Sequence, residues 1–227
     1  MSFTLHEVSN DAEFESIIAV ANAGYSRPFN GLWEILKGPS IEQSVDECAS
    51  RYALWHRSDP TSRWIYVSDT SGKVLGGMQW NIHEKNPYEQ GAPKLPAYWW
   101  PEGDMKTLSD MVLDNFFKGR PGRMSKPHFL ISYCFVHPEH RHRGVASMMM
   151  RWGLEKADAQ GLDTFVESTE DGRGLYEAFD FVVIDKLYLD AEISAPSEEY
   201  SKLRNKLLPL NGYVMVREQG GQKEKAE

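Results

Sequence analysis

Hydrophobic positions in the first third of the chain follow two spacings, each typical of one kind of secondary structure. Apolar residues that alternate with polar ones indicate half-buried strands, whereas apolar residues three and four positions apart indicate one face of a helix. These spacings predict a strand, two helices and two further strands, in that order. The expected ranges are 3–8, 12–23, 41–58, 64–68 and 74–83, with Ser40 as the N-cap of the second helix.

The last part of the chain continues with strands and helices in alternation. A run of apolar, β-branched and aromatic residues over 129–136 is long enough for one buried strand. A helix follows, because Val145, Met149 and Trp152 recur at helical spacing. The further expected elements are a strand over 162–168, a short helix at 175–179, a strand over 182–189, a helix within 190–210 and a strand over 213–217.

Residues 84–127 do not continue this pattern. The segment begins with prolines and glycines, passes through Tyr98, Trp99 and Trp100, and then shows helical spacing. It is too long for a hairpin connection and is expected to be an insertion with structure of its own. The three aromatic residues suit two roles equally well: they could line a binding site, or they could pack the insertion onto the main body.

Composition narrows the class of protein. The chain has 227 residues, 41% of them hydrophobic, and a net charge of −8, which disfavours a nucleic-acid binder. No apolar run approaches the length of a membrane span, and no signal-peptide pattern is visible. Cys48 and Cys134 lie far apart and have no partners at metal-ligand spacing, so neither a disulfide framework nor a metal site is expected. A reducing, cytoplasmic location is predicted.

The turn between the strand over 129–136 and the following helix combines glycine with positive charge. Arg141 and Arg143 flank His142, and Gly144 precedes the helix. A helix N-terminus has free N–H groups, and glycine lets the backbone approach a ligand closely. In an acidic chain, such an island of positive charge suits a compact anion such as a phosphate better than a polymer.

Written as a pattern, Arg141 to Ala146 is R-x-x-G-x-A, preceded by V-x-P. It resembles the acyl-CoA-binding signature of the GNAT superfamily of N-acetyltransferases, and the chain is similar throughout to GNAT-like proteins of fungal type. A second motif follows downstream, where Leu175 to Phe181 resembles the L-Y-x-x-x-G-F helix of that family. Asp180 stands where the family has glycine, and aspartate tolerates the left-handed conformation better than most residues.

The resemblance implies the GNAT acyl-CoA N-acyltransferase fold of the α/β (α+β) class, a mixed central sheet flanked by helices. One domain is expected over residues 1–217, with the insertion at 84–127 before the cofactor strand. Residues 218–227 are charged and are expected to form a disordered tail.

The resemblance also implies acetyl-CoA as co-substrate and assigns roles to individual residues. Tyr176 is expected to be the general acid that protonates the leaving thiolate. Backbone groups of the cofactor strand and of the turn are expected to hold the thioester and the pyrophosphate. The expected cofactor-binding residues are Phe135, Val136, Arg141, His142, Arg143, Gly144, Val145, Ala146 and Ser147.

The general base is less clearly marked. Strict alternation puts Leu130, Ser132 and Cys134 on one face of the cofactor strand and Phe129, Ile131, Tyr133 and Phe135 on the other, and neither face has a carboxylate or an imidazole. Glu167, on the next strand, is the preferred candidate because a carboxylate in a buried strand is uncommon. The alternatives are His83, Glu84, His128 and a water chain.

Two classes of function remain open. The first is an acetyl-CoA-dependent transfer to a primary amine of a small molecule or peptide. The second is a non-catalytic acyl-CoA binder, a sensor or a relic. Neither nucleic acid nor membrane is an expected partner, and the oligomeric state is left open, with a homodimer as one option.

Overall fold

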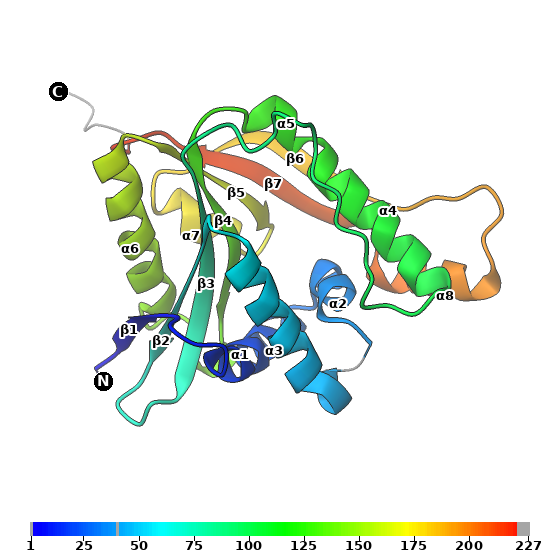
Figure 1. Ribbon diagram of the computed structural model, residues 1–227, viewed down its shortest axis with the longest axis horizontal. Coiled ribbons are helices and arrows are strands. Elements are labelled where there is room, and N and C mark those ends of the chain that lie inside the picture. The colour runs from blue at the N-terminus through cyan, green and yellow to red at the C-terminus, as the bar shows by residue number, and fades with distance from the viewer. Residues whose placement is uncertain (1, 40, 222–227) are drawn as a thin grey trace.

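The computed structural model describes residues 2–39 and 41–221, with the backbone alone over 41–44. Its strands form one seven-stranded sheet in the order β1-β2-β3-β4-β5-β7-β6 (Figure 1). Only the central pair, β4 and β5, is parallel; the neighbours on either side are antiparallel. The strands are β1 (Thr4–Glu7), β2 (Ser62–Ser68), β3 (Val74–His83), β4 (His128–Val136), β5 (Asp163–Thr169), β6 (Val182–Leu189) and β7 (Leu210–Arg217).

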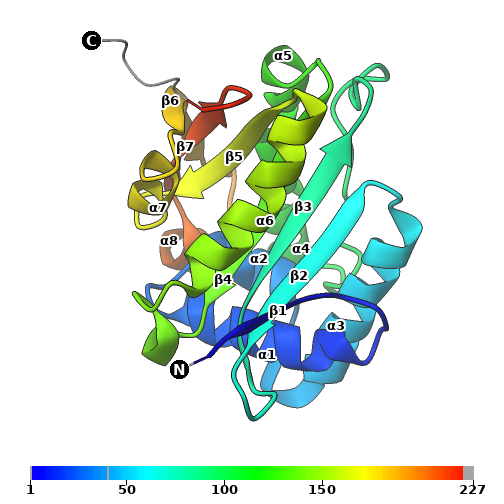
Figure 2. The same cartoon turned by 90° about the vertical axis from the view of Figure 1, so that its left-hand side faces the viewer.

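Helices cover both faces of this sheet, which confirms the predicted fold class. Helix α6 lies on one face, and α1 and α3 lie on the other (Figures 1 and 2). The helices are α1 (Glu13–Ser26), α2 (Gly31–Lys37), α3 (Ile41–Ser58), α4 (Asp104–Lys118), α5 (Arg120–Arg123), α6 (Val145–Gln160), α7 (Arg173–Glu177) and α8 (Glu198–Leu207), with a 3-10 turn at Pro138–His140. Among the helices of the described chain, none is both long and apolar enough to cross a membrane.

Two apolar cores on opposite faces of the sheet explain the spacings in the sequence. Under α6, Trp80 of β3 is fully buried with Met149. On the other face, Phe14 of α1 and Tyr52 of α3 pack around Trp64 of β2. Each strand therefore contributes alternate residues to each core, and each helix contributes one stripe.

A β-bulge in β4 breaks the strict alternation expected from the sequence. Tyr133 pairs with Gln79 and Ile131 pairs with Trp80, so Ser132 is an extra residue. As a result, Phe129 and Ile131 face α6 before the bulge, but Tyr133 and Phe135 face α1 and α3 after it. The expectation that these four residues share one face was wrong, because the bulge shifts the side-chain period by one residue.

The central strands separate just beyond this bulge. β4 and β5 pair only from His128 to Ile131 and from Asp163 to Val166. Past that point the ends of both strands are free of each other. In an open sheet, the space beyond the carboxyl ends of parallel strands is where ligands usually bind.

The predicted insertion at residues 84–127 holds α4 and α5 and packs beside α2 and α8, in a third apolar cluster. The indole N–H groups of Trp99 and Trp100 both donate to the carbonyl of Ile35, each at 2.8 Å. Neither indole lines the large cavity described below, so the structure places both tryptophans where they attach the insertion to α2.

Three expectations about the chain stay predictions. The single domain over residues 1–217 stays a prediction. Ser40, the expected helix cap, and 222–227, most of the expected tail, lie outside the described residues.

Candidate functional site

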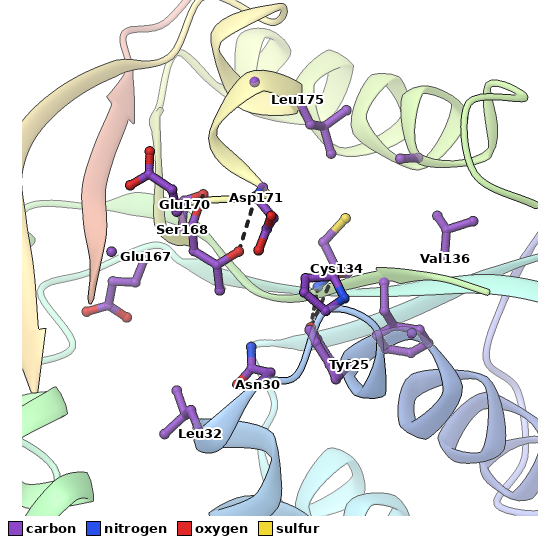
Figure 3. Close-up of a pocket in the computed structure, with 18 of the residues that line it drawn as sticks. Tyr25, Asn30, Leu32, Cys134, Val136, Glu167, Ser168, Glu170, Asp171 and Leu175 are labelled. Atoms are coloured by element: carbon purple, nitrogen blue, oxygen red, sulfur yellow. Dashed lines mark hydrogen bonds between the residues drawn. The ribbon is translucent and has the colours of Figure 1, made fainter. Parts of the chain in front are cut away.

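A cavity of about 940 Å³ opens where β4 and β5 separate (Figure 3). One end, here called the turn end, is lined by residues 140–142 and 144–147. The other, here called the apolar end, is lined by Phe29, Leu32, Phe116, Leu187, Leu189 and Leu210. Between the two ends lie the last residues of β4 and the segment from Glu167 to Gly172. The cavity therefore connects the β4–α6 turn with residues that are distant from it in the sequence.

Backbone conformation makes the turn end open. Gly144 has φ +85°, which favours glycine, and an added Cβ there would meet no atom within 4 Å. His142 also has a positive φ, of 57°. Helix α6 begins at Val145, so the amide groups of its first turn have no intrahelical acceptor. The predicted phosphate cradle has the local geometry that an anion requires.

Side chains around the turn add positive charge and fix its position. The Arg141 guanidinium donates from Nη2 to the carbonyl of Gly24 at 2.7 Å and from Nε to the carbonyl of Val136 at 3.4 Å. It thus ties the turn to α1 and β4. Burial, together with the charges of Lys73 and Arg143, lowers the pKa of His140.

A group of possible metal ligands lies beside the turn. Donor atoms of His137, Glu139 and His140 come within 4.8 Å of one another. The positive charges of Lys73 and Arg143 act on the same imidazole of His140. This electrostatic environment favours a phosphate over a cation.

The polar backbone of β4 faces the cavity at alternate residues. The N–H of His137 donates to the carbonyl of Leu75, so the antiparallel pattern turns the peptide groups of Phe135 toward β3 and those of Cys134 and Val136 away from it. Phe135 lines the cavity, but its backbone polar groups are directed into the sheet. The groups available to a ligand on this strand are those of Cys134 and Val136.

The Tyr25 hydroxyl occupies one part of that free edge. It donates to the carbonyl of Cys134 at 3.1 Å and accepts from the N–H of Cys134 at 3.3 Å (Figure 3). Burial raises the pKa of Tyr25 far above its usual range, so the phenol keeps its proton near neutral pH. The N–H of Val136 remains as a donor that faces the cavity.

Tyr176 lies in α7, directly behind the cavity wall. This residue is 6% exposed, and its hydroxyl lies close to the thiol of Cys134. Burial, then the neighbouring Cys134 and Tyr25, raises the pKa of Tyr176 well above its usual value. Leu175 lines the cavity, whereas Tyr176 is not among its lining residues. Burial also raises the pKa of the Cys134 thiol to about 12.

The end of α7 confirms the expectation for Asp180. This residue has φ +67°, in the left-handed region where the family motif has glycine. The N–H of Phe181 returns to the carbonyl of Tyr176 at 3.1 Å. The helix therefore closes in the manner that glycine usually permits.

Glu167 is the one candidate base that lines the cavity. Its side chain is 3% exposed, and its carboxylate accepts hydrogen bonds from Nε and Nη2 of Arg120 at 3.1 and 2.5 Å. Burial acts to lower the pKa of Arg120, but the charge and hydrogen bonds of Glu167 outweigh it and raise that pKa. The carboxylate is thus half of a buried ion pair formed with the insertion.

The histidine candidates lie at the other end of the sheet. His83 and His128 pair with each other across β3 and β4, with ring centroids 4.8 Å apart. His128 is six residues before Cys134, roughly 20 Å along an extended strand. Neither histidine lines the cavity, nor does Glu84.

Sequence reasoning missed two residues that shape the site. Tyr25 lies in the last turn of α1. Its position at the end of the helix was the only signal in the sequence that could have marked it. Arg120 lies in the insertion, 47 residues before its partner Glu167, and no spacing in the sequence joins the two. Both act through contacts between segments that are distant along the chain.

Comparisons with known proteins agree with this architecture. The model of the acetyltransferase (GNAT) family matches residues 29–181. The chain matches none of the curated proteins.

Three solved structures illustrate the similarity of fold. Arylalkylamine N-acetyltransferase 2 from Aedes aegypti has a TM-score of 0.66 at 11% identity, covering 97% of this chain and 100% of that one. A histone acetyltransferase HPA2 and related acetyltransferase from Corynebacterium glutamicum has a TM-score of 0.58 at 14% identity, with both chains fully covered. A phosphinothricin acetyltransferase from Sinorhizobium meliloti, solved with acetyl-CoA, has a TM-score of 0.54 at 15% identity, covering 100% and 93%. The family match extends from the loop before α2 through the turn and the α7 motif, and the chain belongs to the GNAT family of acetyltransferases.

Proposed function

We propose that this protein transfers an acetyl group from acetyl-CoA to a primary amine of a small molecule or peptide. The observation that carries the proposal is the single cavity joining the α6 turn to the free edge of β4. An anion site and an outward-facing peptide N–H, that of Val136, are what an elongated phosphorylated thioester needs. Acetyl-CoA supplies the activated acetyl thioester, and the chain supplies binding, orientation and proton movement.

The residues at the turn end fit the phosphates of such a co-substrate. We assign the diphosphate to the amides from His142 to Ser147, with the charge of Arg143 beside them. The space where a Cβ of Gly144 would stand is open, so the backbone can be approached directly. Arg141 contributes by holding the turn against Gly24 and Val136.

The free edge of β4 is assigned to the thioester. The N–H of Val136 faces the cavity and is the proposed donor to the developing oxyanion. Tyr25 is a positioning residue, because its hydroxyl satisfies both peptide groups of Cys134 and so keeps this edge in place. The carbonyl of Phe135 is directed toward β3, so Phe135 contributes its ring and not its peptide groups.

Proton transfer is assigned to two side chains, Tyr176 of α7 and Glu167 of β5. Tyr176 keeps its proton because its pKa is raised, and it lies against Cys134 at the free edge. We propose that it donates to the departing thiolate. Glu167 is proposed to accept the proton of the acceptor amine through Oε1, because this oxygen accepts one hydrogen bond from Arg120 and keeps a second lone pair, whereas Oε2 accepts two.

A non-catalytic acyl-CoA binder is the second candidate. Two observations favour it: Tyr176 does not line the cavity, and Glu167 is engaged by Arg120. Calorimetry with acetyl-CoA and thiol detection of CoA across a panel of amines separate the two functions. Tight binding with amine-dependent thiol release supports the transferase, whereas tight binding without release on any amine supports the binder.

The cytoplasmic location and the oligomeric state stay predictions. Cys48 and Cys134 are both free thiols, which supports a reducing compartment.

A further inference from the structure

The apolar end of the cavity is assembled from four separate elements. Leu32 comes from α2, Phe116 from α4, Leu187 and Leu189 from β6, and Leu210 from β7. These five side chains pack in the apolar cluster that joins α2, α4 and α8, not in the core beneath α6. Phe29, from the loop before α2, is 52% exposed at the same wall. The apolar end is thus a separate surface from the one that the turn provides.

Acidic side chains separate this apolar end from the turn end. Glu167, Glu170 and Asp171 line the middle of the cavity, and Asp171 points into it (Figure 3). The charge of Glu167 is balanced by Arg120. Glu170 accepts a hydrogen bond from the Tyr213 hydroxyl, which carries no charge, and Asp171 is exposed. These acidic side chains attract an ammonium group on the ligand and repel a carboxylate on the ligand.

None of the six residues of the apolar end can pair with a charged group. The nearby guanidinium of Arg120 is already bound by both carboxylate oxygens of Glu167. Of the polar side chains that line the cavity beside the apolar end, Asn30 and Asn211 are uncharged amides, so a charged tail placed here loses its water without gaining a charged partner, which is costly. An alkyl or aryl tail instead replaces water at no such cost.

We propose that the acceptor is a monoamine with an alkyl or aryl body and no carboxylate. Its ammonium lies at the acidic wall, and its body fills the apolar end. This inference rests on the proposed acetyltransferase function and names the substrate class of the same site. Phe116 determines specificity because it is the cavity-lining residue that the insertion contributes to the apolar end.

A matched panel of amines tests this assignment. Release of CoA thiol is measured with propylamine, butylamine, hexylamine and 2-phenylethylamine, and with 6-aminohexanoate, lysine and a lysine-containing peptide. We expect kcat/KM to rise roughly threefold for each methylene that becomes buried. We expect 6-aminohexanoate to be at least ~10-fold poorer than hexylamine.

The outcomes of the panel separate the two levels of the proposal. A flat alkylamine series, or equal use of 6-aminohexanoate and hexylamine, overturns the substrate class and leaves the transferase standing. Turnover of the peptide alone does the same. No release with any amine, although acetyl-CoA binds, overturns the transferase function and this inference with it.

Neighbouring phenylalanines of α4 give a matched pair of variants. Phe116 and Phe117 have ring centroids 5.3 Å apart, both stack on Arg120, and both are half-buried, but Phe116 alone lines the cavity. We expect Phe116→Ala to lower kcat/KM for hexylamine ~10-fold and to leave propylamine nearly unchanged. Phe117→Ala is expected to preserve the hexylamine-to-propylamine ratio. Equal ratios in the two variants overturn the role of Phe116.

Two further variants complete the test: one controls for misfolding of Phe116→Ala, and the other probes the charge of Asp171. Phe116→Leu keeps most of the volume, and we expect a smaller loss, about threefold, with an unchanged melting temperature. Asp171→Asn is expected to narrow the gap between hexylamine and 6-aminohexanoate by about threefold. An unchanged gap in this variant overturns the repulsion argument.

Discussion

The two ends of the cavity are built in different ways. The turn end comes from one continuous stretch, from His140 to Ser147, and it offers backbone groups in special conformations. The apolar end comes from four elements and offers side chains. Because the turn end binds through backbone groups, it tolerates substitution of most of its side chains but not substitution of the glycine that has a positive φ. An end made of side chains can change its specificity while the fold and the cofactor turn remain.

The sharpest test of this difference is Gly144→Val. A β-branched residue is strained at φ +85°, and its side chain would occupy the open space at the turn. We expect the dissociation constant of acetyl-CoA, measured by calorimetry, to rise at least ~1000-fold. Gly72→Val is the matched control, since Gly72 also has φ +85° and open surroundings but lies in the β2–β3 turn. Equal affinities in both variants would contradict the assigned phosphate site.

Arg120→Met probes the middle of the cavity, where Arg120 and Glu167 come from distant segments. Glu167 would be left charged and buried without a partner, which costs about 3–5 kcal/mol of unfolding free energy. Adding Glu167→Gln should recover part of that loss. Arg123→Met is the control, because its partner Asp185 is half-exposed and such pairs contribute under ~1 kcal/mol. Urea unfolding measures the unfolding free energy of all three variants. Equal losses of unfolding free energy in the two single arginine variants would show that the buried ion pair contributes no more than the exposed one.

Tyr176→Phe tests the wall between the two ends. Loss of the general acid should lower kcat roughly 10- to 1000-fold, with little change in acetyl-CoA affinity or melting temperature. Tyr188→Phe removes a hydroxyl from an exposed side chain and is expected to leave kcat unchanged. A normal kcat with a lowered melting temperature in Tyr176→Phe would instead identify the residue as part of the core under α6.

The smallest expected effect is the pH dependence of stability caused by His83, at the end of β3. Burial, then the neighbouring His128, lowers the pKa of His83 to about 4. Between pH 6.5 and about 4, the unfolded chain therefore binds more protons than the folded one, and stability falls as the pH falls. We expect His83 to contribute about 1–2 kcal/mol of this loss. His83→Gln should flatten the unfolding free energy between pH 6.5 and 5, and an unchanged slope would exclude His83 as the cause.

Where contacts are local, sequence patterns were sufficient. The ranges of β3 and β6 match those expected, and α6 and α7 follow their motifs, because each depends on the periodicity of its own residues. Strand β7 begins at Leu210, three residues earlier than expected, since Leu210 pairs with Leu189 of β6. The bulge at Ser132 was also not visible, because only the register against β3 creates it.

The features of the candidate site also fall into those set by local sequence and those set by contacts between distant segments. The sequence by itself determined the fold family, the glycine turn at Gly144 and the short helix that contains Tyr176, because conformational freedom and helix termini are properties of short segments. Only the tertiary structure decided that Tyr25 occupies the edge of Cys134, that Arg120 pairs with Glu167 and that six apolar side chains form one end of the cavity. The two pairs of residues are each separated by 47 or more positions in the sequence. They come together because of the tertiary fold, and not because of the local conformational preference of either segment.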